Sequence, residues 1–169
     1  MHRYLTYMAL SLFFSACHRQ VAPPELPDQK PTEEQMVALN RDIVSHEATD
    51  IRLVLQRYGW KVQKTESGLF YEITESRDGQ TLRPGERVQL KYRLTLLDGE
   101  PVSDSDSDGL MEVVVEKSDA PVGLHQLLRL MKRGEMARAV IPSHLAYGQI
   151  GDGDRIPGFA SLVYYIEVQ

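Results

Sequence analysis

Near its C-terminus the chain reads Ile141-Pro142-Ser143-His144-Leu145-Ala146-Tyr147-Gly148. Further along come Gly151, Ile156-Pro157 and the apolar run Leu162-Val163-Tyr164-Tyr165-Ile166. Proline has no backbone N–H, so a strand that reaches Pro142 is expected to end there. The glycines that follow are typical of turns. The sequence therefore predicts a strand, a turn-rich loop that presents Tyr147, and a final strand.

Alternation of apolar and polar residues predicts further strands upstream. The clearest case is 88–96, where every second residue from Val88 to Leu96 is apolar, Tyr92 among them, which indicates one buried face. Other strands are expected at 69–73, 111–115, 136–141 and 161–168, and a short helix at 123–133. This pattern predicts an α+β domain over residues 61–169, with an antiparallel sheet curled over the one short helix.

A long helix is predicted before this domain. Thr32-Glu33-Glu34-Gln35 matches a capping box, and Gly59 is a typical residue just past a helix end. Between them apolar residues recur at helical spacing from Met36 to Tyr58, which predicts a helix over 33–58 within a segment 32–60. Such a stripe needs a partner, either this domain or a second copy of the chain, so a homodimer through this helix is one possibility.

The first residues read as a targeting signal. Residues 1–16 combine Arg3 with a short apolar stretch, which is too short to span a bilayer comfortably. Phe14-Ser15-Ala16-Cys17 resembles a bacterial lipobox, so we expect a lipid anchor at Cys17; the alternative is an ordinary secretory signal with an incidental cysteine. The proline-containing segment 17–31 is expected to be an extended tether. These features predict the bacterial cell envelope, on the periplasmic side.

Composition limits the classes of function. Of the 169 residues 42% are hydrophobic, which suffices for a buried core, and the net charge of −5 argues against a nucleic-acid partner. Asp104-Ser105-Asp106-Ser107-Asp108-Gly109 begins like a calcium loop, but Val115 stands where the loop needs a glutamate. A solvated acidic loop is therefore expected, and no metal site.

Residues 66–169 resemble the FKBP family of peptidyl-prolyl cis-trans isomerases, and most of all its lipoprotein branch associated with gliding motility. The resemblance rests on Ala146-Tyr147-Gly148 and Ile156-Pro157, with Gly151 between them and the Leu-Val-Tyr strand after them. It implies a half-barrel sheet, catalysis on X–Pro bonds of polypeptide substrates, and no cofactor.

Prolyl isomerisation needs an unusual kind of site. The barrier of ~18–20 kcal/mol comes from amide resonance, which the twisted transition state loses. An apolar pocket penalises the charge-separated planar amide more than the twisted one, and hydrogen bonds to the twisted geometry add to this. No nucleophile or metal is required. An aromatic-lined cavity with one or two polar groups at its rim is the expected arrangement.

The resemblance also implies which residues form this site. It assigns a catalytic role to Tyr92, Tyr147, Ile156 and Tyr164, with the Tyr147 hydroxyl bound to a substrate carbonyl. It places seven further residues in the substrate pocket, namely Val102, Ser103, Met111, Val113, Ala120, Pro121 and Leu124.

Several of these positions depart from the family pattern. Leu124 stands where the family usually has a tryptophan, and Ser103 where it has an aspartate. Val102 and Met111 replace aromatic residues, and Pro121 replaces a residue whose N–H binds the substrate. We therefore expect weak isomerase activity. The alternatives are a non-catalytic prolyl-peptide-binding chaperone, or a structural module of an envelope or motility assembly recruited through helix 33–58.

Overall fold

A computed structural model describes residues 30–169 of the chain. The predicted signal peptide 1–16, Cys17 and most of the predicted tether 17–31 lie outside the described residues, so these predictions stay untested. Within residues 30–169, none of the helices combines the length and apolar character that crossing a bilayer needs.

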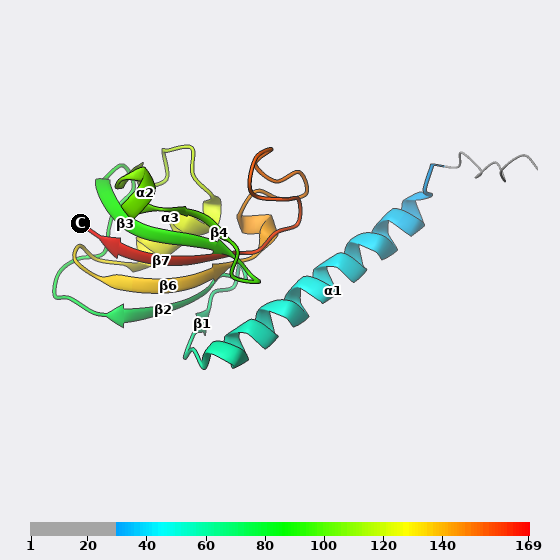
Figure 1. The fold of residues 1–169 in the computed structure, drawn as a ribbon, viewed down its shortest axis with the longest axis horizontal. Coiled ribbons are helices and arrows are strands. Elements are labelled where there is room, and N and C mark those ends of the chain that lie inside the picture. The colour runs from blue at the N-terminus through cyan, green and yellow to red at the C-terminus, as the bar shows by residue number, and fades with distance from the viewer. Residues whose placement is uncertain (1–29) are drawn as a thin grey trace, which may run out of the picture.

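The described part of the chain forms one antiparallel sheet with helices (Figure 1). The strands are β1 Gln63–Lys64, β2 Phe70–Glu75, β3 Arg87–Leu96, β4 Pro101–Asp104, β5 Met111–Val114, β6 Met136–Ile141 and β7 Leu162–Val168. The helices are α1 Glu33–Tyr58, α2 Ser105–Asp108, α3 Val122–Leu130 and the single 3₁₀ turn η1 Ser143–Leu145. The strand order is β1-β2-β6-β7-β3-β4, and β5 also pairs with β3. The predicted α+β class, a curled antiparallel sheet with an N-terminal helix, is confirmed.

The main core lies between the sheet and α3. Along β3 buried and exposed residues alternate, so the strand gives one face to the core and the other to the surface. Leu124, Leu127 and Leu128 of α3 are fully buried against the inner face. At Gly123 a Cβ atom would lie only 2.4 Å from Ile141 Cγ2. The helix can therefore approach the sheet this closely only with glycine at that position.

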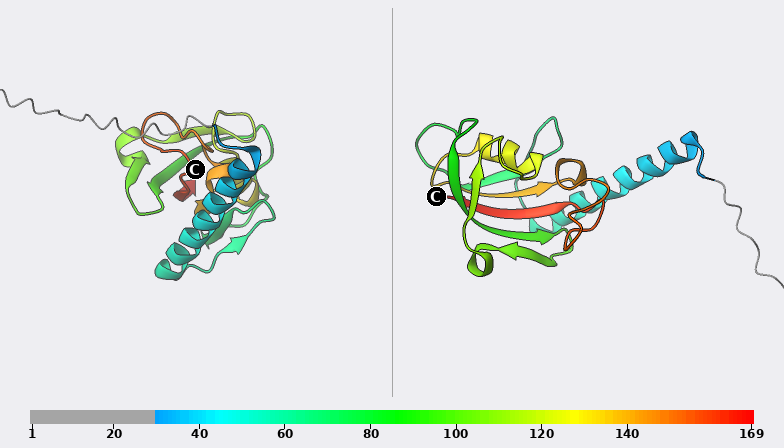
Figure 2. Two further views of the ribbon diagram at one scale, coloured as in Figure 1. Left: turned by 90° about the vertical axis from the view of Figure 1, so that its right-hand side faces the viewer. Right: turned by 90° about the horizontal axis from the view of Figure 1, so that it is seen from above.

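Helix α1 packs on the opposite, outer face of the sheet, but only along its C-terminal half. Ile51 and Leu55 form a second buried cluster with Val140 of β6 and Val163 of β7, and Trp60 packs against it. Figures 1 and 2 show the other half of α1 projecting beyond the sheet. The capping box of Thr32 and Gln35 is present, and Gly59 ends the helix with φ of 62°.

Differences from the predicted elements have local causes. β1 and β4 are too short, at 2 and 4 residues, to show a clear alternation. The predicted acidic loop is wrong in part, because Ser105–Asp108 forms one helical turn. Asp104 accepts hydrogen bonds from the N–H groups of Asp106 and Ser107, and this N-cap starts the turn. The α3 helix also ends earlier than expected, at Leu130.

Candidate active site

Two of the predicted catalytic tyrosines lie on the inner face of neighbouring strands. Leu94 of β3 pairs with Tyr164 of β7, and Tyr92 pairs with Ile166, so the two tyrosines are diagonal neighbours. Tyr164 is only 2% exposed. Burial raises the pKa of Tyr164, and the nearby phenols of Tyr147 and Tyr92 raise it further. Tyr164 therefore stays a neutral hydroxyl in the core.

Tyr147 reaches the same region from the loop after β6. The loop turns at η1, where the N–H groups of Ala146 and Gly148 donate to the carbonyl of Ser143. Tyr147 remains 40% exposed. Partial burial raises the pKa of Tyr147, and the carboxylates of Asp152 and Asp119 add to the effect. The Tyr147 hydroxyl is therefore a neutral donor in the accessible part of the site.

The loop that carries Ile156 is closed by hydrogen bonds from backbone N–H groups to the side chain of Asp152. The carboxylate of Asp152 accepts from the N–H groups of Asp154 and Ile156, at 2.9 and 2.7 Å. A Cβ atom on Gly151 would lie 2.0 Å from the Ile156 carbonyl oxygen, and Gly151 also has a positive φ of 78°. Glycine at this position therefore allows the loop to fold back and bury Ile156.

A chain of hydrogen bonds connects Tyr92 to an acidic side chain that the sequence analysis did not single out for this role. The Tyr92 hydroxyl lies 2.6 Å from Ser103 Oγ, and Ser103 Oγ donates to the carboxylate of Asp108. Because Ser103 uses its proton toward Asp108, the Tyr92 hydroxyl donates to Ser103. Ser103 stands where the family usually has an aspartate, and Asp108, five residues further along, supplies a carboxylate that binds the Ser103 hydroxyl.

The remaining predicted pocket residues surround these tyrosines. Val102, Val113 and Leu124 belong to the same buried cluster as Tyr92, Ile156 and Tyr164, and Met111 and Ala120 pack against it half-buried. Pro121 is buried at the N-cap of α3. The structure therefore brings the predicted residues together on one side of the sheet, while their roles in binding and catalysis stay predictions.

Sequence comparison decides the family. Residues 79–169 match the family model of FKBP-type peptidyl-prolyl cis-trans isomerases. The chain belongs to this family. A probable FKBP-type isomerase of Haemophilus influenzae is 32% identical over 110 residues, covering 65% of this chain and 45% of the relative. The 22 kDa FKBP-type isomerase of Escherichia coli is 33% identical over 112 residues, covering 63% of this chain and 52% of the relative.

Solved structures agree with this assignment. An isomerase from Pseudomonas syringae superimposes with a TM-score of 0.64 at 26% identity, covering 83% of this chain and 95% of that one. FkpA from Escherichia coli gives 0.65 at 23% identity, covering 83% and 73%, and supports the fold alone. The chain spans about half the length of the curated relatives it matches.

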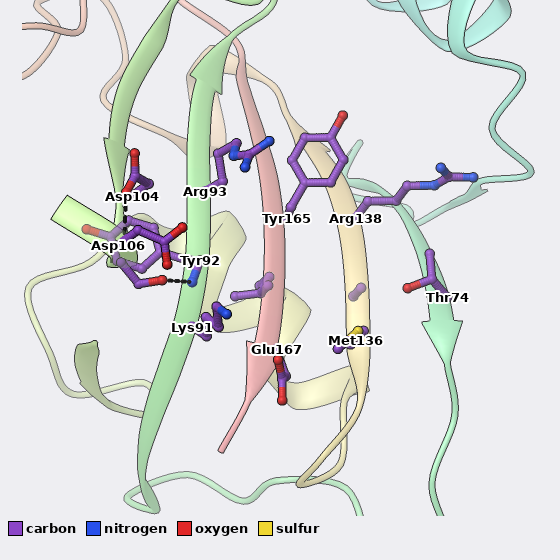
Figure 3. Close-up of a pocket in the computed structure, with 13 residues that line it drawn as sticks. Thr74, Lys91, Tyr92, Arg93, Asp104, Asp106, Met136, Arg138, Tyr165 and Glu167 are labelled. Carbon is purple, nitrogen blue, oxygen red and sulfur yellow. Dashed lines mark hydrogen bonds between the residues drawn. The ribbon is translucent and has the colours of Figure 1, made fainter. Parts of the chain in front are cut away.

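A second cavity, of about 380 Å³, lies on the outer face of the FKBP-type domain, and Tyr92 is the one predicted catalytic residue in its lining (Figure 3). A cross-strand row crosses it in register, consisting of Glu72, Arg138, Tyr165, Arg93 and Asp104. Arg138 pairs with Glu72 at 2.9 Å, and its guanidinium lies 4.7 Å from the Trp60 ring centroid. At each end of the row an acidic residue therefore lies opposite an arginine, Glu72 opposite Arg138 and Asp104 opposite Arg93, and such opposite-charge neighbours stabilise the sheet.

The histidines of the FKBP-type domain have structural partners. His125 is buried; its Nδ1 accepts from the Glu116 N–H at 3.0 Å, and its Nε2 then donates to the Ser118 carbonyl. Exposed His144 lies within 2.9 Å of the Ser67 carbonyl oxygen. Within the described residues, no group of three or more metal-binding side chains occurs.

Proposed function

We propose that this protein catalyses cis-trans isomerisation of X–Pro bonds in polypeptides, at the inner-face site of Tyr92, Tyr147 and Tyr164. The observation that carries the proposal is the meeting of three tyrosines from two strands and a loop, beside an apolar cluster, in a chain of the FKBP-type family. X–Pro isomerisation takes tens of seconds without catalysis and can limit the rate of folding, so a catalyst of this step speeds the folding of its substrates.

The mechanism follows from the character of the site. Leu124 and Ile156 belong to the apolar cluster beside the tyrosines, and apolar surroundings disfavour the planar, charge-separated amide. Tyr147 is partly exposed and its hydroxyl, whose raised pKa keeps it protonated well beyond neutral pH, can donate to a substrate carbonyl. Pro121 has no N–H to offer, and Leu124 gives less surface than a tryptophan. Slow turnover is therefore expected.

A protease-coupled assay with a short X–Pro peptide tests the proposal. Acceleration above the uncatalysed rate by the full-length protein supports catalysis. A background rate, together with suppression of the aggregation of a denatured test protein, supports the alternative of a prolyl-peptide-binding chaperone. This alternative is supported by the departures from the family pattern at Ser103, Pro121 and Leu124.

We also propose that the protein works at the bacterial envelope, anchored by a lipid on Cys17, and that its substrates are envelope proteins. The lipobox-like Phe14-Ser15-Ala16-Cys17 supports this proposal. Mass spectrometry of the protein expressed in bacteria tests it, because a diacylglycerol on Cys17 adds a defined mass. Cys17→Ser is expected to remove both the added mass and the membrane association, and an unmodified Cys17 would contradict the proposal.

The exposed half of α1 supports a further proposal, a homodimer. Met36 and Leu39 continue the buried stripe of the helix, yet they are 44% and 54% exposed. Apolar residues at this spacing favour a helical partner, and a second copy of the same helix supplies one. The alternative is that a protein of an envelope or motility assembly binds the same exposed stripe of α1.

A further inference from the structure

One polar residue interrupts the apolar stripe by which α1 contacts the sheet. Glu47 lies one helical turn before Ile51 and on the same side of α1, between half-buried Ile43 and the buried cluster. A carboxylate at such a position needs hydrogen-bond partners, because burial of an unpaired charge is costly. The structure supplies two partners, and neither lies in α1.

Both hydrogen bonds of Glu47 reach residues that flank the proposed site. The backbone N–H of Ser143 donates to Glu47 Oε1 at 2.6 Å, and the hydroxyl of Ser161 donates to the same oxygen at 2.6 Å. Ser143 and Ser161 are 6% and 5% exposed. Hydrogen bonds to a carboxylate are short and strong when they are this well shielded.

The two serines lie at the two ends of the loop between β6 and β7. Ser143 begins η1, and its carbonyl accepts from the N–H groups of Ala146 and Gly148 on either side of Tyr147. Ser161 directly precedes β7, which carries Tyr164. The loop between β6 and β7 contains both Tyr147 and Ile156, so Glu47 holds the two ends of this loop together from the outer side.

Around Glu47, packing alone does not hold α1 against the rest of the protein. A cavity of about 420 Å³ lies beside Glu47, lined among others by Ile43, Phe159 and Ser161. Figure 1 shows α1 passing the β6–β7 loop near this point. The two hydrogen bonds are therefore the close link between the middle of the helix and the loop, whereas the apolar cluster anchors the helix further along.

The geometry points to Glu47 as a positioning residue, through which helix α1 holds the Tyr147 loop and the start of β7 in place for prolyl isomerisation. This inference rests on the proposed isomerase function. It makes α1 part of the working unit, so that a partner bound to the free half of α1 is mechanically connected to the site. Small displacements of catalytic groups have large effects on rate, which is why such a support matters.

Substitutions in the full-length protein test this role. Glu47→Ala removes both hydrogen bonds, and Glu47→Gln keeps an acceptor oxygen for them. Ser161→Ala removes one bond without altering α1. Asp42→Asn is the matched control, since it removes a carboxylate from an exposed position of the same helix. All rates are measured at a low temperature at which circular dichroism shows each variant folded.

Two readouts are combined, namely kcat/KM for an X–Pro peptide and hydrogen–deuterium exchange. Glu47→Ala is expected to lower kcat/KM roughly tenfold and to speed amide exchange in residues 143–148, with Ser161→Ala intermediate. Glu47→Gln is expected to restore most of the rate, and Asp42→Asn to match the wild type. A residue needed only for stability would lower the melting temperature without these changes in the folded protein.

The outcomes separate this inference from the function on which it rests. If the wild-type protein does not accelerate isomerisation, the proposed function fails, and the exchange of residues 143–148 still reports on the Glu47 contact. If Glu47→Ala and Ser161→Ala leave both the rate and the loop exchange at wild-type values, or if Asp42→Asn has the same effect as Glu47→Ala, the positioning role is wrong.

Discussion

The three tyrosines of the site differ in what surrounds their hydroxyl groups. Tyr92 donates to Ser103 and through it is connected to Asp108. Tyr164 is sealed in the core, whereas Tyr147 is partly open to solvent. Tyr147 is therefore the residue best placed to contact a peptide carbonyl, and Tyr92 and Tyr164 are better placed to shape the surface around it.

Tyr147→Phe is accordingly expected to lower kcat/KM for an X–Pro peptide by about fivefold, the equivalent of one hydrogen bond of ~1 kcal/mol. Tyr165→Phe is the matched control, because Tyr165 neighbours Tyr164 in β7 but faces the outer cavity. The protease-coupled assay measures both. Equal rates for Tyr147→Phe and the wild type would remove Tyr147 from the mechanism.

Substitution of Pro121 is expected to raise kcat/KM rather than to lower it. Its φ of −52° at the start of α3 is also open to other residues, so Pro121→Ile restores a backbone N–H without forcing a new backbone conformation. If the resemblance places this residue correctly, the added donor is expected to raise kcat/KM several-fold, by about 1 kcal/mol at most. A folded Pro121→Ile variant with an unchanged rate would show that this N–H does not reach the substrate.

At the scale of elements, the contact between α3 and the sheet depends on one glycine. Gly123→Ala places a methyl group 2.4 Å from Ile141 Cγ2 and 3.2 Å from the Leu145 carbonyl oxygen. Overpacking of this kind costs ~1–3 kcal/mol. Urea unfolding is expected to show that loss for Gly123→Ala and little change for Val122→Ala, since Val122 is 57% exposed. Equal stability of the two variants would contradict the close packing.

Glu135 connects two further turns and makes stability depend on pH. Its burial acts to raise its pKa, but hydrogen bonds from the Arg77 and Lys132 N–H groups and the Ser76 hydroxyl outweigh burial, so the pKa falls below its ordinary value of 4.5. A carboxylate whose pKa is lower in the folded than in the unfolded state stabilises the protein at pH values above its unfolded-state pKa. This contribution is lost as the pH falls through the folded-state pKa.

Urea unfolding at pH 7 and at successive pH values below 4.5 measures how the contribution of Glu135 to the free energy of unfolding depends on pH. Glu135→Gln is expected to be less stable than the wild type at pH 7, and the difference is expected to shrink as the acid protonates Glu135. Glu66→Gln, an exposed change of the same chemistry, serves as the control. A difference between wild type and Glu135→Gln that stays constant across this pH range would refute the assignment.

Most strands and the long helix could be predicted from the sequence because alternation and helical spacing are local signals, as along β3 and α1, whereas the short strands β1 and β4 carry no such signal. The contacts of Asp108 and Glu47 could not be predicted in this way. Asp108 reaches Ser103 only because a helical turn brings it back, and Glu47 meets Ser143 and Ser161 across about a hundred residues of chain. The family resemblance gave the positions of the tyrosines, which composition and spacing alone do not distinguish from core residues.

At the scale of the whole molecule, the free half of α1 predicts self-association. Leu39→Glu places a charge on the exposed continuation of the buried stripe and is expected to convert a dimer into a monomer, because a buried unpaired charge is strongly disfavoured. Ala38→Glu adds the same charge on the opposite side of α1 and is expected to leave the mass unchanged. Light scattering coupled to gel filtration measures both, and a monomeric wild-type protein would contradict the proposed dimer.

The central claim is that prolyl peptides isomerise on the inner face of the sheet, beside Tyr92, Tyr147 and Tyr164. Exchange NMR of an X–Pro peptide with the labelled full-length protein tests it most directly, because one sample reports both the cis–trans exchange rate and the residues that the peptide contacts. We expect accelerated exchange and chemical-shift changes centred on Tyr92, Tyr147 and Ile156. Uncatalysed exchange, or shift changes centred on Arg93 and Tyr165 at the outer cavity, would contradict the claim.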